Sequence, residues 1–318
     1  MMTLAAAGLD IPLFLQQIEN GITLGAIYAL VALGYTLVYG IIELINFAHG
    51  DVFMWSTIVT LTLLQQLGFN QLSAPLSGLG LVGLMALLII VGMIVSATIN
   101  FAIERVAYRR LRRAPRLAPL IAAIGASFIL VNVGRVWRGS GQLFYPQIFP
   151  TSGINLGPVR INYLHIFIVA LAVVLMYALN RFIQTTKLGR AMRATAQDPE
   201  AAALMGVNID RTISTTFILG GALAGAAGVI YSLLNGVAQV TTGFQLGLIA
   251  FTAAVLGGIG NVQGAVLGGF LIGLIQSLTV QYIPNGFQWS TATVFVILVL
   301  ILVLRPSGLL GQQVPDKV

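Results

Sequence analysis

Apolar residues run through this chain in long, nearly uncharged stretches, each about as long as one bilayer crossing. A run of about 18 or more apolar residues predicts a transmembrane helix rather than a barrel strand. We expect an all-α integral membrane protein, a polytopic helical bundle with eight or nine transmembrane helices. The predicted spans are 21–41, 51–67, 79–103, 117–137, 163–183, 212–235, 246–260, 262–282 and 288–304. The seventh is short enough to be a half-helix or re-entrant element, and an interfacial position is one interpretation of segment 12–20.

Composition excludes a water-soluble fold. Of the 318 residues, 58% are hydrophobic and 8% are charged, whereas about a quarter of the residues of a soluble domain are charged. No soluble domain or linker interrupts the spans, so residues 1–318 are expected to form one transmembrane domain. The chain contains no cysteine, which excludes disulfides and thiolate metal sites. No metal site is expected.

Basic residues cluster in two loops and set the predicted orientation. Cytoplasmic loops are enriched in Lys and Arg, so the loops after the third and fifth spans are expected inside. Segment 138–162 contains only Arg138 and Arg160 and is expected outside, and nine crossings then put the N-terminus outside. The two basic loops contain Arg105, Arg109, Arg110, Arg112, Arg113 and Arg116, and Arg181, Lys187, Arg190, Arg193 and Arg211; the tail contains Arg305 and Lys317. This topology accounts for the pI of about 10.1 without nucleic-acid binding.

One polar island, at about 184–211, separates the fifth and sixth spans. Asp198 is suited to accept hydrogen bonds at the start of a short helix, Pro199 suits its first position, and Glu200 faces the positive end of its dipole. The remaining positions are helix formers followed by a left-handed stop: Ala201, Ala202, Ala203, Leu204, Met205 and Gly206. A separate helix on the wet side of a membrane protein indicates a docking site for a soluble partner.

A second polar cluster lies between the first two spans. Glu43, Asn46, His49 and Asp51 occur where the sequence otherwise avoids charge. Ionisable residues at membrane depth are costly and usually face a cavity or a partner. Three interpretations remain open: a structural turn at the membrane edge, a helix break that lines a conduit, and a proton relay. The other spans offer no matching acid for the relay.

Glycines mark two further features. Gly220, Ala224 and Gly228, with Gly221 and Gly225, form stripes of small residues on the sixth span, and small residues at intervals of four allow close helix contact in lipid. Five glycines within 257–268, together with Asn261 and Gln263, mark an interruption between two helices. Either a structural turn or a substrate-facing break fits this pattern, because exposed backbone within a membrane needs protein, water or substrate to satisfy it.

The sequence contains no recognisable catalytic machinery. It has no Gly-x-x-x-x-Gly-Lys-Ser/Thr loop, no Gly-x-Ser-x-Gly elbow and no His-Glu-x-x-His motif. The chain is therefore not expected to be an enzyme or to bind a cofactor of its own. Any ATP used would be bound by another chain.

Three stretches together resemble a known family. Ile45-Asn-Phe-Ala-His-Gly-Asp51, the island from Gly189 to Asn208, and Leu256-Gly-Gly-Ile-Gly-Asn261 with Gly264 occur in this order. The chain resembles the membrane permease subunits of branched-chain amino-acid ABC importers, in particular the shorter of the two permeases, from about residue 21 to residue 306.

The resemblance implies a set of partners and a location. It implies a second related permease, two cytoplasmic ATPases that bind ATP and Mg, and an extracytoplasmic substrate-binding protein, all at the bacterial cytoplasmic membrane. Asp198–Gly206 would be the coupling helix that seats in an ATPase, and the substrate path would lie at the permease–permease interface. Import of urea or short amides is an alternative, and an ion-coupled secondary transporter is another.

Overall fold

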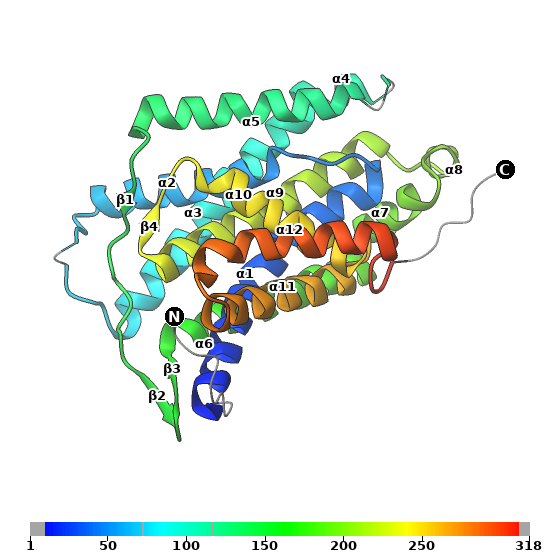
Figure 1. Cartoon of the computed structure of the whole chain (residues 1–318). Coiled ribbons are helices and arrows are strands. Elements are labelled where there is room, and N and C mark those ends of the chain that lie inside the picture. The colour runs from blue at the N-terminus through cyan, green and yellow to red at the C-terminus, as the bar shows by residue number, and fades with distance from the viewer. Residues whose placement is uncertain (1–9, 72, 113, 116, 312–318) are drawn as a thin grey trace.

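The computed structural model describes residues 10–71, 73–112, 114–115 and 117–311. Nine long helices in this part of the chain form one bundle (Figure 1). They are α1 (Ile11–Ile42), α2 (His49–Gln66), α3 (Gly78–Ile103), α5 (Leu117–Arg138), α6 (Tyr163–Thr185), α9 (Ile209–Asn235), α10 (Thr242–Gly257), α11 (Val262–Tyr282) and α12 (Gly286–Leu304). A π-helical turn, Glu104–Tyr108, continues α3 into the short α4 (Arg109–Leu111), and α7 (Lys187–Gln197) and α8 (Pro199–Leu204) precede α9. The all-α prediction is confirmed.

Seven of these helices are long and apolar enough to cross a membrane. The other two, α2 and α10, are shorter or more polar, and most of their residues are buried among the surrounding helices. Because other helices surround α2 and α10, few of their side chains contact lipid, and polar residues on them are therefore less costly. The interpretation of 12–20 as an interfacial segment is wrong, because these residues form the first turns of an unbroken α1.

The two ends of the bundle differ in character. One end carries the antiparallel pairs β1 (Leu143–Phe144) with β4 (Val237–Ala238) and β2 (Gly153–Leu156) with β3 (Val159–Asn162). There Gln16 of α1 exchanges hydrogen bonds of 3.0 and 3.1 Å with the Arg160 backbone. The opposite end holds α4, α7, α8 and the end of α12 (Figure 1).

This polarity agrees with the charge pattern of the sequence. The described basic residues of the two Arg-rich loops lie at the α8 end, whereas 138–162 lies at the strand end. Arg113, Arg116 and Lys317, which also entered that prediction, lie outside the described residues. We therefore call the α8 end cytoplasmic and the strand end external.

Glycines bring the helices into backbone contact. A Cβ added at Gly25 of α1 would lie 2.7 Å from the Cα of Phe270 in α11, and one added at Gly225 of α9 would lie 2.3 Å from the carbonyl oxygen of Gly92 in α3. Such contacts are possible only for residues without a side chain. The predicted role of the small-residue stripes in close packing is confirmed, and α1 packs along α11 as α9 packs along α3.

The bundle contains the same helix break twice. In each case a long helix ends on a left-handed residue, Glu43 (φ 52°) or Gly236 (φ 67°), and a buried helix begins six residues later at His49 or Thr242. The backbone hydrogen bonds correspond as well. Those of the first break are Glu43 N–H to Tyr39 O and His49 N–H to Asn46 O, and those of the second are Gly236 N–H to Ser232 O and Thr242 N–H to Gln239 O. Each pair of equivalent residues is 193 positions apart.

The two breaks run in opposite directions and meet inside the bundle. α1 runs from the external to the cytoplasmic end, whereas α9 runs the other way. The buried helices that follow cross at the equivalent glycines Gly50 and Gly243, where a Cβ on Gly50 would lie 2.2 Å from the Gly243 carbonyl oxygen. The units α1–α2–α3 and α9–α10–α11 therefore form an inverted repeat. The seventh predicted span, expected to be short, is the 16-residue α10, and α2 is also short, with 18 residues.

Candidate functional site

The polar island folds into two short helices at the cytoplasmic end. Thr186 caps α7 by accepting a hydrogen bond from the Gly189 N–H at 2.9 Å. Asp198 then ends α7 and caps α8, because its Oδ1 accepts from the N–H groups of Glu200 (2.9 Å) and Ala201 (3.0 Å). Gly206 follows α8 at φ 83°. The predicted caps of the helix are confirmed, and Pro199 occupies its first position.

α8 turns its largest apolar side chains into solvent. Leu204 is 89% exposed and Met205 is 85% exposed, whereas Ala202 is buried against the neighbouring helices. The end of α8 is closed by hydrogen bonds from the Gly206 and Val207 N–H groups to the carbonyls of residues 203 and 202. A small helix with a rigid backbone thus presents an apolar tip and the exposed Glu200 side chain, and exposed apolar clusters of this kind mark interaction surfaces.

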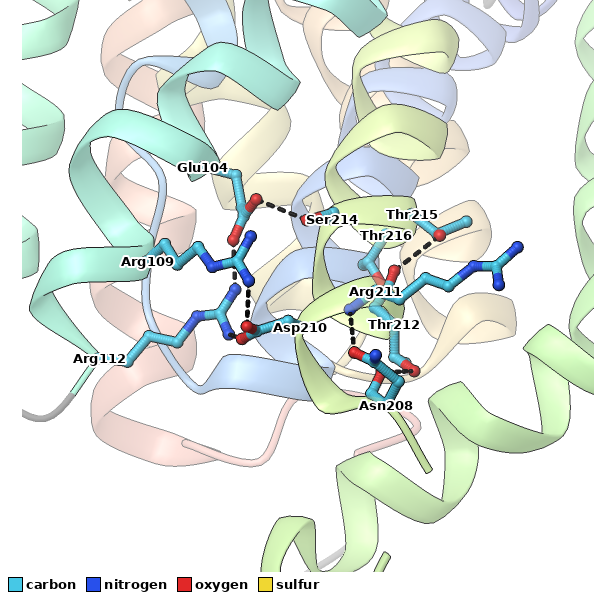
Figure 2. A network of polar contacts seen from close by, with 10 residues as sticks. All are labelled: Glu104, Arg109, Arg112, Asn208, Asp210, Arg211, Thr212, Ser214, Thr215 and Thr216. Atoms are coloured by element: carbon cyan, nitrogen blue, oxygen red, sulfur yellow. Dashed lines mark hydrogen bonds and ion pairs between the residues drawn. The ribbon is translucent and has the colours of Figure 1, made fainter. Parts of the chain in front are cut away.

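A network of charged side chains joins α9 to the end of α3 (Figure 2). Asp210, in the first turn of α9, pairs with Arg109 and with Arg112, the latter at 2.5 Å. Arg112 also pairs with Glu104, whose side chain is fully buried, and Ser214 donates to Glu104 Oε2 at 2.7 Å. The carboxylate of Glu104 is therefore compensated by an arginine and a hydroxyl, as a buried charge requires.

This network lies directly after the island. Asn208 caps α9 by accepting from the Arg211 N–H at 2.9 Å, and Asp210 is two residues further on. Glu104 begins the π-helical turn between α3 and α4, a local irregularity often found at functional sites. Contacts thus run from the end of the island through the start of α9 to the junction of α3 and α4. Sequence analysis predicted only a topological role for Arg109 and Arg112, because no local pattern indicates which loop an acid such as Asp210 will contact.

The first helix break is a buried polar cluster. Asn46, His49 and Asp51 are each at most 2% exposed. Asn46 donates to Asn100 Oδ1 at 3.0 Å, and Asn100 donates to the Phe217 carbonyl at 2.6 Å. The break therefore runs from the exposed Glu43 into the bundle, and its polar side chains from Asn46 onward lie in the interior rather than at the surface.

Two side chains of this cluster have no hydrogen bond of normal geometry. This holds for both ring nitrogens of His49 and for both carboxylate oxygens of Asp51. The imidazole packs edge-on against Tyr35, with ring centroids 4.7 Å apart, and the Asp51 carboxylate lies against Gly243 at the start of α10. Unpaired buried polar atoms lower the free energy of unfolding. Buried polar groups with this cost are expected where they serve function rather than stability.

The remaining sequence-predicted path residues lie elsewhere. Glu43 is exposed at the cytoplasmic end of α1. Asn261 caps α11 by accepting from the N–H groups of residues 263 and 264 and donates to the Leu310 carbonyl at 2.8 Å. Gln263 is exposed in the first turn of the same helix. The α10–α11 turn thus forms a cytoplasmic corner with the C-terminal segment, away from the cluster of Asn46, His49 and Asp51.

Comparison with known proteins gives a consistent family. A family profile described as a branched-chain amino acid transport system permease component matches residues 17–304. The high-affinity branched-chain amino acid transport system permease proteins BraD of Pseudomonas aeruginosa and LivH of Escherichia coli are each 40% identical to the chain, over 96% of it and 98% of the relative. The probable branched-chain amino acid transport permease protein LivH of Methanocaldococcus jannaschii is 31% identical over 92% of the chain and 91% of its own length. No solved structure matches the chain significantly.

Proposed function

The chain belongs to the family of branched-chain amino-acid transport permeases, and from this premise we propose that it forms part of a membrane path for branched-chain or other neutral amino acids. It is a multi-pass integral protein of the bacterial inner membrane and the permease subunit of an ABC importer. We further propose that it works with a second related permease, two cytoplasmic ATPases and an extracytoplasmic substrate-binding protein. ATP and Mg would bind only to the ATPases, and this chain would perform no catalysis.

The exposed tip of α8 is the observation that carries the coupling proposal. Leu204 and Met205 are almost fully exposed at the cytoplasmic end, where burial in a groove of a partner would remove apolar surface from water. Full burial of one such side chain contributes about 1.5–3 kcal/mol. We propose that this tip and Glu200 dock into an ATPase subunit, with Asp198, Pro199, Ala201, Ala202 and Gly206 holding the helix in shape.

The charged network provides a route from that tip into the bundle. Asp210 ties the start of α9 to Arg109 and Arg112, and Arg112 in turn is paired with Glu104 at the end of α3. When ATP draws the two ATPases together, α8 would move with them and the network would carry α9 and α3 along. The work comes from the difference in ATP affinity between the two conformations.

The buried cluster at the first helix break is the proposed centre of the substrate path. Asn46, His49 and Asp51 lie where α2 and α10 begin, and broken helices of inverted repeats form substrate sites near the middle of many transporters. Glu43, Asn261 and Gln263 are assigned to the cytoplasmic mouth instead, because they lie at that end of the bundle.

Uptake by a reconstituted assembly tests the coupling proposal. The complete importer is placed in liposomes with ATP inside, and uptake of labelled leucine is measured with and without vanadate. The double variant Leu204→Ser/Met205→Ser should lower vanadate-sensitive uptake by roughly tenfold or more, since a few kcal/mol of docking free energy is lost. Less ATPase should co-purify with it.

Leu79→Ser is the matched control. Leu79 is 91% exposed, like Leu204, but lies at the external end of α3. Its replacement should leave ATPase binding and uptake unchanged. Normal ATP-driven uptake by the α8 double variant, with the ATPases still bound, would contradict the docking role of α8.

A further inference from the structure

A cavity of about 470 Å³ opens beside the crossing of the two helix breaks. One wall is a single face of α5 that includes Ser127, Phe128 and Arg135. The facing wall comes from both breaks, with Phe47 from the first and Phe244 from the second. This volume is within the range of small-molecule sites, and the position connects the cavity with the buried polar cluster.

The cavity has an apolar middle. Phe128 is 65% exposed and Phe244 is 53% exposed, so their side chains are available to a ligand rather than packed in the core. Aromatic and aliphatic walls with a few polar groups are typical of sites that hold a partly apolar molecule.

The two ends of the cavity differ: Arg135 lines one end, and Ser127 lines the other, with the Asp51 carboxylate buried behind Ser127 and outside the lining. Arg135 lies one turn from the external end of α5, and none of the ion pairs in the described part of the chain includes it. Two turns deeper, about 12 Å along the helix axis, the Ser127 hydroxyl lies against the buried Asp51 carboxylate. Neither oxygen of that carboxylate has a hydrogen bond of normal geometry. The long Arg135 side chain can extend toward Ser127 along the same face.

A free neutral amino acid matches this arrangement. The guanidinium of arginine binds a carboxylate through two parallel hydrogen bonds, and an ammonium group is attracted to a buried carboxylate and a hydroxyl. The apolar side chain of the amino acid would then lie between the two phenyl rings. An uncharged ligand such as urea would supply neither a carboxylate for Arg135 nor a positive charge near Asp51.

We propose that this cavity is a transit subsite for the zwitterion of a neutral amino acid, with Arg135 binding the carboxylate and the Ser127–Asp51 end facing the ammonium. The proposal rests on the proposed function and adds a selection step in the permease itself. It assigns residues of α5 that the sequence pattern had left without any role beyond a membrane span.

The absence of cysteine from the natural chain allows a direct test by thiol labelling. Phe128→Cys places a thiol in the cavity, and Ile129→Cys places one on the adjacent residue, which has the same 65% exposure but does not line the cavity. The membrane complex of both permeases and the ATPases is treated with a membrane-impermeant maleimide, and labelling of this chain is followed over time. The binding protein is omitted so that it does not select the ligand.

Leucine, leucinamide and 4-methylpentanoate serve as probes, because the second lacks the carboxylate and the third lacks the ammonium. Leucine should slow the labelling of Phe128→Cys and leave that of Ile129→Cys unchanged. The concentration of leucinamide that gives half-protection should be at least roughly tenfold higher than that of leucine, as expected for loss of a charge-assisted contact. In Phe128→Cys with Arg135→Gln, half-protection by leucine should need as much ligand as half-protection by leucinamide. With Arg135→Lys, leucine should still protect better than leucinamide, by a smaller margin.

Three outcomes would overturn the subsite while leaving the proposed function intact, provided that the unmodified importer takes up leucine. They are a Phe128→Cys thiol that is never labelled, labelling that leucine does not slow, and leucine protection that Arg135→Gln leaves unchanged. The last result would make Arg135 an anchor for lipid headgroups. If the unmodified importer does not take up leucine, the proposed function fails and the subsite fails with it.

Discussion

The helix break at 43–49 and the break at 236–242 follow the same backbone path and carry different chemistry. The first has Asn46, His49 and Asp51, all buried. The equivalent residues of the second are Gln239, Thr242 and Phe244, and Phe244 is half exposed in a cavity. Both breaks have the same left-handed cap, the same six-residue connection and the same hydrogen bonds.

This difference distinguishes the residues that form the backbone path of the break from the side chains that give the first break its chemistry. The second break forms without a histidine or a carboxylate, so neither group is needed for the backbone path. By contrast, both buried helices have a glycine at the crossing, and the two glycines are in contact. Our proposal that the polar residues of the first break act in transport rests on this separation, and four sets of substitutions test it.

Substitution of the crossing glycines should have the largest effect. Gly50→Ala puts a methyl group 2.2 Å from the Gly243 carbonyl oxygen, and Gly243→Ala puts one 2.7 Å from the Gly50 carbonyl oxygen. Because the neighbour is backbone in both cases, each change should cost about 3 kcal/mol, measured by thermal unfolding of the solubilised assembly. Gly80→Ala, with no atom within 4 Å of the added carbon, is the control that should be tolerated. Equal stability of all three variants would show that the crossing is not tightly packed.

Removal of the buried charge should affect transport more than stability. Asp51→Asn keeps the shape of the side chain and removes an uncompensated carboxylate, so folding stability should stay level or rise. Leucine uptake should nevertheless fall by roughly tenfold, about 1.4 kcal/mol. Asp10→Asn, at an exposed cap outside the bundle, should leave uptake unchanged. Unchanged leucine uptake by the Asp51→Asn variant would show that the carboxylate is not required in the substrate path.

Asn46 and its equivalent Gln239 should differ in their contribution to stability. Asn46→Ala leaves the buried Asn100 Oδ1 without its 3.0 Å donor and should cost about 1–3 kcal/mol. Gln239 is only half buried, so Gln239→Ala should change the free energy of unfolding by less than about 0.5 kcal/mol. Denaturant titration of the two variants measures the contrast, and equal losses would mean that both breaks depend on their polar side chains.

Substitution at the left-handed caps should have a smaller effect than substitution of the crossing glycines. Gly236 has φ 67° and open space where a Cβ would be placed, so Gly236→Ala should cost about 1–2 kcal/mol through backbone strain alone. Glu43→Gly, at the equivalent position, relieves the same strain and should change stability by less. A melting temperature for Gly236→Ala equal to that of the unmodified chain would show that the cap conformation is not maintained.

Much of the helical organisation could be predicted from the sequence. Long apolar runs located eight of the nine long helices to within four residues at each end, whereas α1 begins ten residues before its predicted start. The Asp198-Pro199 pair located the start of α8 at the correct position. Each of these signals is local. The hydrophobicity of a span and the capping of a helix depend on neighbouring residues in the chain, so a single sequence contains the necessary information.

The break at 43–49 was recognised only in part. Its polar residues marked an irregularity. Asn261 and Gln263 were considered for a separate substrate-facing break, and the structure puts their turn at the cytoplasmic corner. The second break, at 236–242, contains no charged residue and gave no signal of its own. The equivalence of Gly50 and Gly243 became visible only through their contact.

Amino-acid order was sufficient to predict a membrane bundle, the end of it that is basic, and the position of a capped helix outside the lipid. The tertiary structure alone decided that Asp210 meets Arg109 and Arg112, that the two breaks cross, and that Arg135 shares a cavity with Phe244. The reason is physical. In a bilayer the lipid is as apolar as the protein interior, so hydrophobicity does not indicate which face of a helix meets which neighbour. That choice is made by close packing of small residues and by pairing of buried charges across distant parts of the chain.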